Sequence, residues 1–67
     1  MEIKHLVGEA AGQVWHVLNT EGAQTLPQLR RKANGTEPFL DFAVGWLLRE
    51  EKIEIDREKK VFRVRLR

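Results

Sequence analysis

Thr36-Glu-Pro-Phe-Leu-Asp-Phe-Ala-Val-Gly-Trp-Leu-Leu-Arg-Glu-Glu-Lys-Ile53 is the stretch that decides the fold, because it concentrates large apolar residues. It predicts a helix over about residues 37–50 that runs into a strand. We expect Thr36 to be the N-cap, with its hydroxyl accepting a hydrogen bond from a free N–H of the first turn. Pro38 then falls in that turn, where its missing N–H costs little.

The apolar residues of this helix surround nearly the whole helix. One stripe at helical spacing comprises Leu40, Ala43, Val44 and Leu47. Phe42 lies on the opposite side and Trp46 at the edge of the stripe. A helix this apolar on nearly all sides is expected to be central, with neighbours on more than one face.

The hydrophobic period changes from 3.6 to 2 after Glu51. Apolar and charged residues alternate on both sides of a charged segment, residues 56–60. This pattern predicts an antiparallel hairpin with one buried face, formed by strands at about 52–56 and 61–66. The apolar set is Ile53, Ile55, Phe62, Val64 and Leu66.

A first helix is predicted over residues 3–20, with Gly22 as its C-terminal stop. Gly8 and Gly12 are unexpected inside it, because each costs about 1 kcal/mol relative to alanine. They lie one turn apart and leave room for a helix or a large ring to approach. The favoured interpretation is intramolecular packing, for example under Trp46, and the alternative is a contact between subunits.

A second helix is predicted over residues 26–33. Thr25 and Gln28 match a capping box, and Asn34-Gly35 ends the helix because both residues tolerate positive φ. Ala23-Gln24 could add one brief strand before it. Three helices at about 3–20, 26–33 and 37–50, followed by the hairpin, make an α+β winged helix-turn-helix. We expect residues 1–67 to form one such domain.

Part of this sequence resembles a known family. Ala43-Val-Gly-Trp-Leu-Leu-Arg-Glu-Glu-Lys-Ile53 is similar to the Ala-Leu-Gly-Trp-Leu-Ala-Arg-Glu-x-Lys-Ile segment of a small stand-alone winged helix-turn-helix family of uncharacterised prokaryotic proteins. Gly12-Gln-Val-Trp15 also looks like the first helix of that family. The resemblance covers nearly the whole chain and implies the fold, with DNA binding by analogy. It carries over no catalytic residues.

Composition argues against several classes of protein. The chain of 67 residues has no cysteine, serine or tyrosine, and its two histidines are too far apart to bind one metal ion as an i, i+4 pair. We therefore expect no enzyme activity, no cofactor and no metal. The charged N-terminal residues exclude a secretory signal or a membrane span and favour a cytoplasmic protein. So small a core makes oligomerisation a reasonable expectation.

Positive charge is concentrated at the C-terminal end. Residues 52–67 carry seven Lys or Arg and three Asp or Glu, whereas residues 1–51 carry five and seven. Clustered cations can neutralise nucleic-acid phosphates, but they can equally form a solvated strand face with cross-strand ion pairs. Both interpretations stay open at this point.

The nucleic-acid interpretation predicts a duplex DNA interface and a role in transcription regulation. Its residues are Thr36 on the third helix, Arg30, Arg31 and Lys32 on the second, and Arg57, Lys59 and Lys60 at the wing tip. Glu37 and Asp41 would repel phosphates at the start of the third helix. We therefore expect weakly specific binding in which the wing makes the main contacts.

The alternative is a homodimerising interaction module without direct DNA contact. Phe42, Gly45 and Trp46 share the side of the third helix away from its main stripe. Such a patch is typical of a protein interface, and a two-fold homodimer is the commonest oligomer. It competes with the interpretation that the first helix and the wing bury Phe42 and Trp46.

Overall fold

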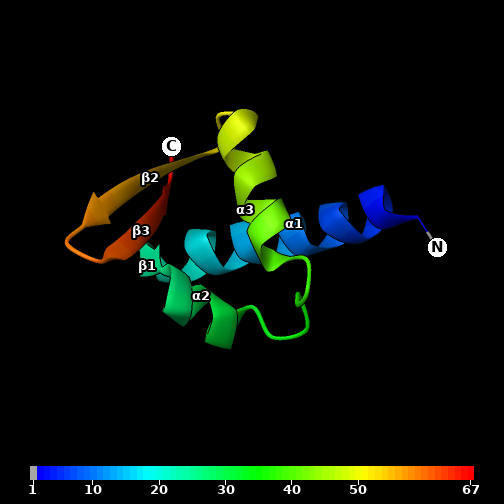
Figure 1. Ribbon diagram of the computed structural model, residues 1–67, viewed down its shortest axis with the longest axis horizontal. Coiled ribbons are helices and arrows are strands. Elements are labelled where there is room, and N and C mark those ends of the chain that lie inside the picture. Colours follow the sequence, from blue (N-terminus) through cyan, green and yellow to red (C-terminus); the bar gives the residue numbers. More distant parts are fainter. Residues whose placement is uncertain (1) are drawn as a thin grey trace.

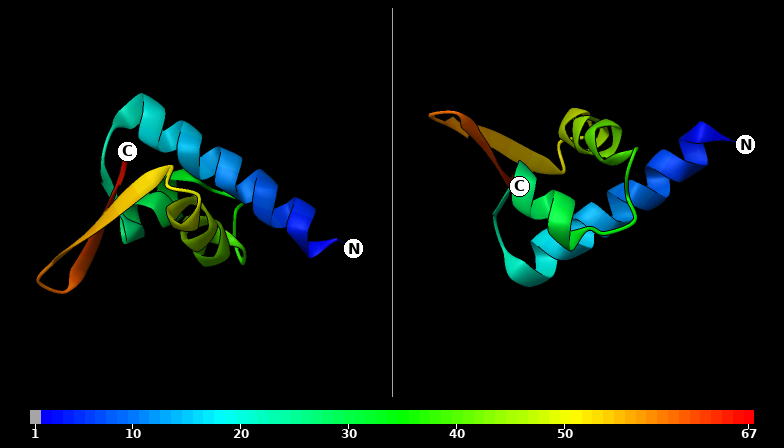
Figure 2. Two further views of the ribbon diagram at one scale, coloured as in Figure 1. Left: turned by 90° about the horizontal axis from the view of Figure 1, so that it is seen from above. Right: turned by 60° about the horizontal axis from the view of Figure 1, so that its bottom comes forward.

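The computed structural model describes residues 2–67 and contains three helices and a three-stranded antiparallel sheet (Figure 1). The predicted winged helix is confirmed. In chain order the elements are α1 (Ile3–Glu21), β1 (Gln24–Thr25), α2 (Leu26–Lys32), α3 (Leu40–Arg49), β2 (Ile53–Glu58) and β3 (Val61–Leu66). The helices gather around the middle of α1, and the β2–β3 hairpin extends away from them as the wing (Figure 2).

The ends of α1 and the start of α2 follow local sequence signals. Gly22 has φ 81° and donates its N–H to the carbonyl of Leu18 at 3.0 Å, which ends α1. The capping box is also confirmed. The Thr25 N–H donates to Gln28 Oε1 at 2.8 Å, and the Gln28 N–H donates to Thr25 Oγ1 at 3.3 Å.

The predicted start of the third helix is wrong. It begins at Leu40 instead of residue 37, and its N-cap residue is Phe39. Thr36 caps nothing: its hydroxyl donates back to the carbonyl of Ala33 at 2.7 Å, and its own carbonyl accepts from the Phe39 N–H at 2.7 Å. The hydroxyl closes a turn on its N-terminal side, so residues 36–39 form a turn and the helix starts later.

The wing is longer than predicted, because β2 continues to Glu58 and only Lys59-Lys60 form the turn. Lys59 adopts φ 58°, which a turn this tight uses. β3 is the central strand of the sheet and pairs with both β2 and β1. The brief strand expected near Ala23-Gln24 therefore exists, with Gln24 opposite Val64.

Five elements contribute to one core. Its largest fully buried apolar side chains are Val14, Leu29, Leu40, Ile53 and Val64, one each from α1, α2, α3, β2 and β3. The predicted inner stripe of α3 is buried. As expected, α3 has neighbours on more than one face, since it contacts both α1 and β2, but its outward face is exposed.

Candidate functional site

The basic end of α2 is held by carboxylates. Arg30 Nη1 donates to both carboxylate oxygens of Glu37 at 3.1 Å, and Nη2 donates to Asp41 Oδ1 at 2.9 Å. The hydrogen bond and charge of Asp41, followed by the charge of Glu37, raise the pKa of the Arg30 guanidinium above its ordinary value. Arg30 thus connects α2 both to the segment before α3 and to the first turn of α3. The two carboxylates largely neutralise its charge.

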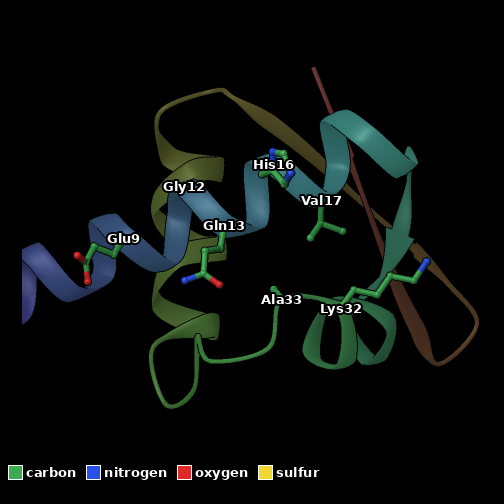
Figure 3. A pocket seen from close by; sticks show the side chains of 7 residues that line it. All are labelled: Glu9, Gly12, Gln13, His16, Val17, Lys32 and Ala33. Atoms are coloured by element: carbon green, nitrogen blue, oxygen red, sulfur yellow. The ribbon is translucent and has the colours of Figure 1, made fainter.

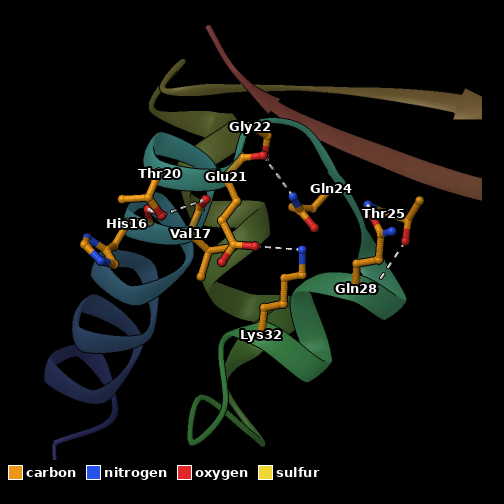
Figure 4. Close-up of polar contacts among 9 residues, drawn as sticks. All are labelled: His16, Val17, Thr20, Glu21, Gly22, Gln24, Thr25, Gln28 and Lys32. Atoms are coloured by element: carbon orange, nitrogen blue, oxygen red, sulfur yellow. Dashed lines mark hydrogen bonds and ion pairs between the residues drawn. The ribbon is translucent and has the colours of Figure 1, made fainter.

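Lys32, at the end of α2, has a partner on α1. Its Nζ lies 2.8 Å from Glu21 Oε1, as the close-up in Figure 4 shows. Arg31, between these two paired cations, is exposed and forms no ion pair within residues 2–67. Of the three α2 cations predicted to contact DNA, two are therefore neutralised by the fold.

An open hollow lies between α1 and the end of α2 (Figure 3). Its polar lining residues Glu9, Gln13, His16 and Lys32 are all exposed to water. Since these groups are solvated rather than held in a desolvated pocket, the hollow offers no fixed polar geometry for a ligand.

The arginines at positions 63, 65 and 67 are also paired. They alternate along β3, and the register of the hairpin places acidic residues of β2 beside them. The pairs are Arg63–Glu58, Arg65–Asp56 and Arg67–Glu54, each with an N–O distance of 3.2 Å, together with Arg67–Glu51. For this part of the wing, the interpretation as a solvated face of cross-strand ion pairs fits the contacts.

The wing tip differs. Arg57, Lys59 and Lys60 are exposed, and none forms an ion pair within residues 2–67. Arg57 Nε donates to the carbonyl of Lys59 at 3.2 Å, and its guanidinium lies 5.6 Å from the centre of the Phe62 ring. A cation–π contact orients the side chain without neutralising its charge. The fold thus brings three unneutralised cations together at the end of a projecting hairpin.

The prediction that Thr36 contacts DNA does not fit its position in the structure. Thr36 is only 2% exposed, and its hydroxyl is engaged with Ala33. A phosphate cannot reach Thr36 without opening the turn, so this side chain is excluded as a phosphate contact. The sequence pattern of a cap residue and that of a residue closing a buried turn are the same, which explains the error.

The outward face of α3 is apolar. Phe42 is 65% exposed and Trp46 48% exposed, with Gly45 between them on the surface. The interpretation that α1 and the wing bury the two aromatic rings is therefore wrong. Both rings instead line an apolar groove against the first half of α1, together with Lys4, Val7 and Gly8.

A second apolar groove lies on the other side of α3, between this helix and the wing. Leu48 and Phe62, both about two-fifths exposed, lie on its two sides. The full lining is Leu26, Asp41, Val44, Gly45, Leu48, Ile55 and Phe62. The alternation in β3 had assigned Phe62 to the buried face. Phe62 does face the helices across this groove, but its position two residues from the turn leaves it 43% exposed.

The helical glycines are not explained by packing within the chain. A Cβ atom built at Gly8, Gly12 or Gly45 would meet no atom within 4 Å. Gly8 does lie in the groove beside Trp46, but the ring does not approach closely enough to require glycine. The favoured interpretation of Gly8 and Gly12 as sites of close intramolecular packing is therefore wrong.

Residues 2–67 contain neither of two further kinds of site. No group of three or more His, Asp or Glu side chains in this range could hold a metal ion. No helix in the same range is both long and apolar enough to cross a membrane.

Comparison with known proteins agrees with the architecture. The chain matches the family described as winged helix-turn-helix domain (DUF2582) over residues 1–66. It is also 33% identical over 64 residues to the uncharacterised protein MJ1608 of Methanocaldococcus jannaschii, an alignment that covers 91% of this chain and 90% of the relative. Because both matches run nearly end to end over the same three helices and wing, the chain belongs to the DUF2582 family of winged helix-turn-helix domains.

Proposed function

We propose that this protein binds duplex DNA through the tip of its wing, as a weakly specific transcription-regulatory module. The observation that carries the proposal is the set of unneutralised cations Arg57, Lys59 and Lys60 at the end of the hairpin. Contacts between such cations and phosphates release condensed counterions, which supplies affinity without reading the sequence. The winged-helix fold supports DNA binding only by analogy of architecture.

The outward face of α3 supports wing-led binding over insertion of α3 into the major groove. Base edges there are read by Arg, Lys, Asn and Gln side chains. The exposed residues of this face are instead Phe42, Gly45 and Trp46, with Asp41 at the start of the helix and its one arginine, Arg49, at the end. A carboxylate and two large apolar rings would meet the phosphate field unfavourably. Specificity from α3 is therefore not part of the proposal.

The test replaces the three tip cations with glutamine and measures binding to duplex DNA over a series of salt concentrations. Loss of three phosphate contacts should weaken binding on the order of a hundredfold at low salt and make the slope of log K against log salt shallower by about 2.7. A matched control, Lys32→Gln/Arg65→Gln/Arg67→Gln, removes the same charge from paired positions. The control should retain most of the affinity.

Two outcomes contradict this proposal. One is an unmodified protein that does not bind DNA even at low salt. The other is an equal loss for the tip variant and the control variant, which would mean that net charge rather than the wing tip governs binding.

A second function is favoured by the exposure of Phe42 and Trp46. We propose as the alternative that the protein is a homodimerising interaction module, with the outward face of α3 as its contact surface. Phe42→Ser should convert a dimer to a monomer in sedimentation experiments at micromolar concentration, because the variant removes the most exposed large apolar side chain of that face.

A further inference from the structure

We infer that two copies of this chain pair through antiparallel α3 helices that cross at Gly45. This inference rests on the second proposed function and specifies its geometry. Gly45 occupies the middle of the outward face of α3, directly opposite the buried stripe. Glycine in a helix costs about 1 kcal/mol, and nothing within the chain requires it here. At the crossing point of two helices, the absence of a side chain lets the backbones approach closely.

The charges around Gly45 are complementary under a two-fold rotation. In an antiparallel pair with its axis at Gly45, residues at equal separations before and after position 45 meet across the interface. Asp41 and Arg49 lie four residues before and after it, about 6 Å along the helix axis in each direction. Each carboxylate therefore meets the guanidinium of the other copy, twice per dimer.

Both side chains have capacity for this contact. Asp41 has a side chain that is 68% exposed and bonds to Arg30 through Oδ1 alone, which leaves its second oxygen for a further donor. Arg49 is exposed and forms no ion pair within residues 2–67. In a parallel arrangement like charges would face each other, so the charge pattern selects the antiparallel pair.

The apolar surfaces are complementary under the same rotation. Phe42 lies three residues before Gly45 and Leu48 three residues after it, so they lie at the same level of the crossing but on its opposite sides. Trp46 of one copy lies on the same side of the crossing as Phe42 and Trp46 of the other, because the two-fold axis brings like edges of α3 together. The aromatic edges of the two α3 helices thus pack against each other on one side of the crossing, and the Leu48 edges, each beside the wing, face each other on the other side.

The amount of exposed apolar surface fits this assignment. Phe42, Trp46, Leu48 and Phe62 remain 43–65% exposed, which leaves about 400 Å² if each side chain offers roughly 150–250 Å². A standard interface buries roughly 800 Å² per partner. The four side chains supply about half of that area as an apolar centre, and the Asp41 and Arg49 pairs lie at its rim.

The decisive experiment uses two charge-reversed chains. In a dimer of Asp41→Lys chains, each new lysine faces Arg49, and in a dimer of Arg49→Glu chains, each new glutamate faces Asp41. Each variant alone should dimerise at least about tenfold more weakly than the wild type. When the two are mixed, every facing pair is again opposite in charge. The mixture should therefore recover wild-type association in sedimentation equilibrium.

Further variants separate folding from pairing. Gly45→Leu introduces a side chain that meets nothing within its own chain, so the monomer should remain folded by circular dichroism while dimerisation is lost. Glu9→Lys reverses an exposed charge on the far side of α1 and should leave the dimer intact.

The outcomes distinguish the pairing from the proposal beneath it. A wild type that stays monomeric contradicts both the antiparallel pairing and the homodimer. The outward face of α3 would then be a contact surface for a different protein. A wild-type dimer that Phe42→Ser dissociates, but whose charge-reversed chains fail to recover on mixing, keeps the interaction module and overturns the antiparallel pairing. Recovery on mixing supports the pairing, because no other arrangement of the two reversals restores both contacts.

Discussion

The end of α2 and the tip of the wing each present three cations within a short segment, yet the fold treats them differently. On α2, Arg30 and Lys32 are engaged by Asp41, Glu37 and Glu21. At the wing tip, no carboxylate pairs with the corresponding cations within residues 2–67. An equal number of cations in the sequence therefore does not mean an equal capacity for binding phosphate. The capacity of each cluster to bind phosphate depends on the carboxylates that folding places beside it.

Removing two of the three carboxylates around α2 should reduce this difference. Glu21→Gln/Glu37→Gln frees Lys32, weakens the hold on Arg30 and removes two negative charges. We expect DNA affinity to rise about tenfold at low salt, with a steeper salt dependence. Glu2→Gln/Glu9→Gln, which removes the same charge from the exposed side of α1, is the control. Equal gains for both variants in a salt titration would contradict a specific masking of the α2 cluster.

Variants of single arginines should also distinguish the two clusters, by a smaller difference in DNA affinity. Arg57→Ala removes an unneutralised cation and should weaken DNA binding about fivefold, with the salt slope reduced by about 1. Arg30→Ala removes a cation already engaged by two carboxylates, so its effect on binding should be less than about twofold. Fluorescence anisotropy on a labelled duplex would measure both. A larger loss for Arg30→Ala would reverse the assignment of the interface.

The features that could be predicted from sequence are those encoded locally. The capping box at Thr25 and Gln28, the stop at Gly22 and the alternation that makes the wing depend on residues within a few positions of each other. The end of α3 was predicted to within one residue by the change of hydrophobic period, but the positive φ of Glu51 (61°) was not, because glycine is the usual signal for that conformation.

The candidate site depends on longer-range geometry. Arg30 meets residues 7 and 11 positions later, and that contact depends on the turn that Thr36 closes. The exposure of Phe42 and Trp46 has a similar origin. Periodicity shows which side of α3 is most apolar, but only the arrangement of α1 and the wing shows that the other side has no cover.

The smallest predicted effect separates charge from backbone conformation at the wing tip. Lys59 adopts φ 58°, a conformation that disfavours residues with a Cβ atom. Lys59→Gly should therefore raise the free energy of unfolding by about 0.5 kcal/mol, after allowing for the greater flexibility of glycine in the unfolded chain. The same change removes one tip cation, so DNA binding should weaken about fivefold.

Lys60→Gly is the matched control, because Lys60 is the other residue of the turn and is not among the residues with positive φ. It removes the same charge but should lower the free energy of unfolding by about 0.5–1 kcal/mol. Thermal denaturation should thus move in opposite directions for the two variants while DNA binding falls equally. If binding instead followed stability, the wing tip would act through its conformation, and its contrast with α2 would not be one of charge.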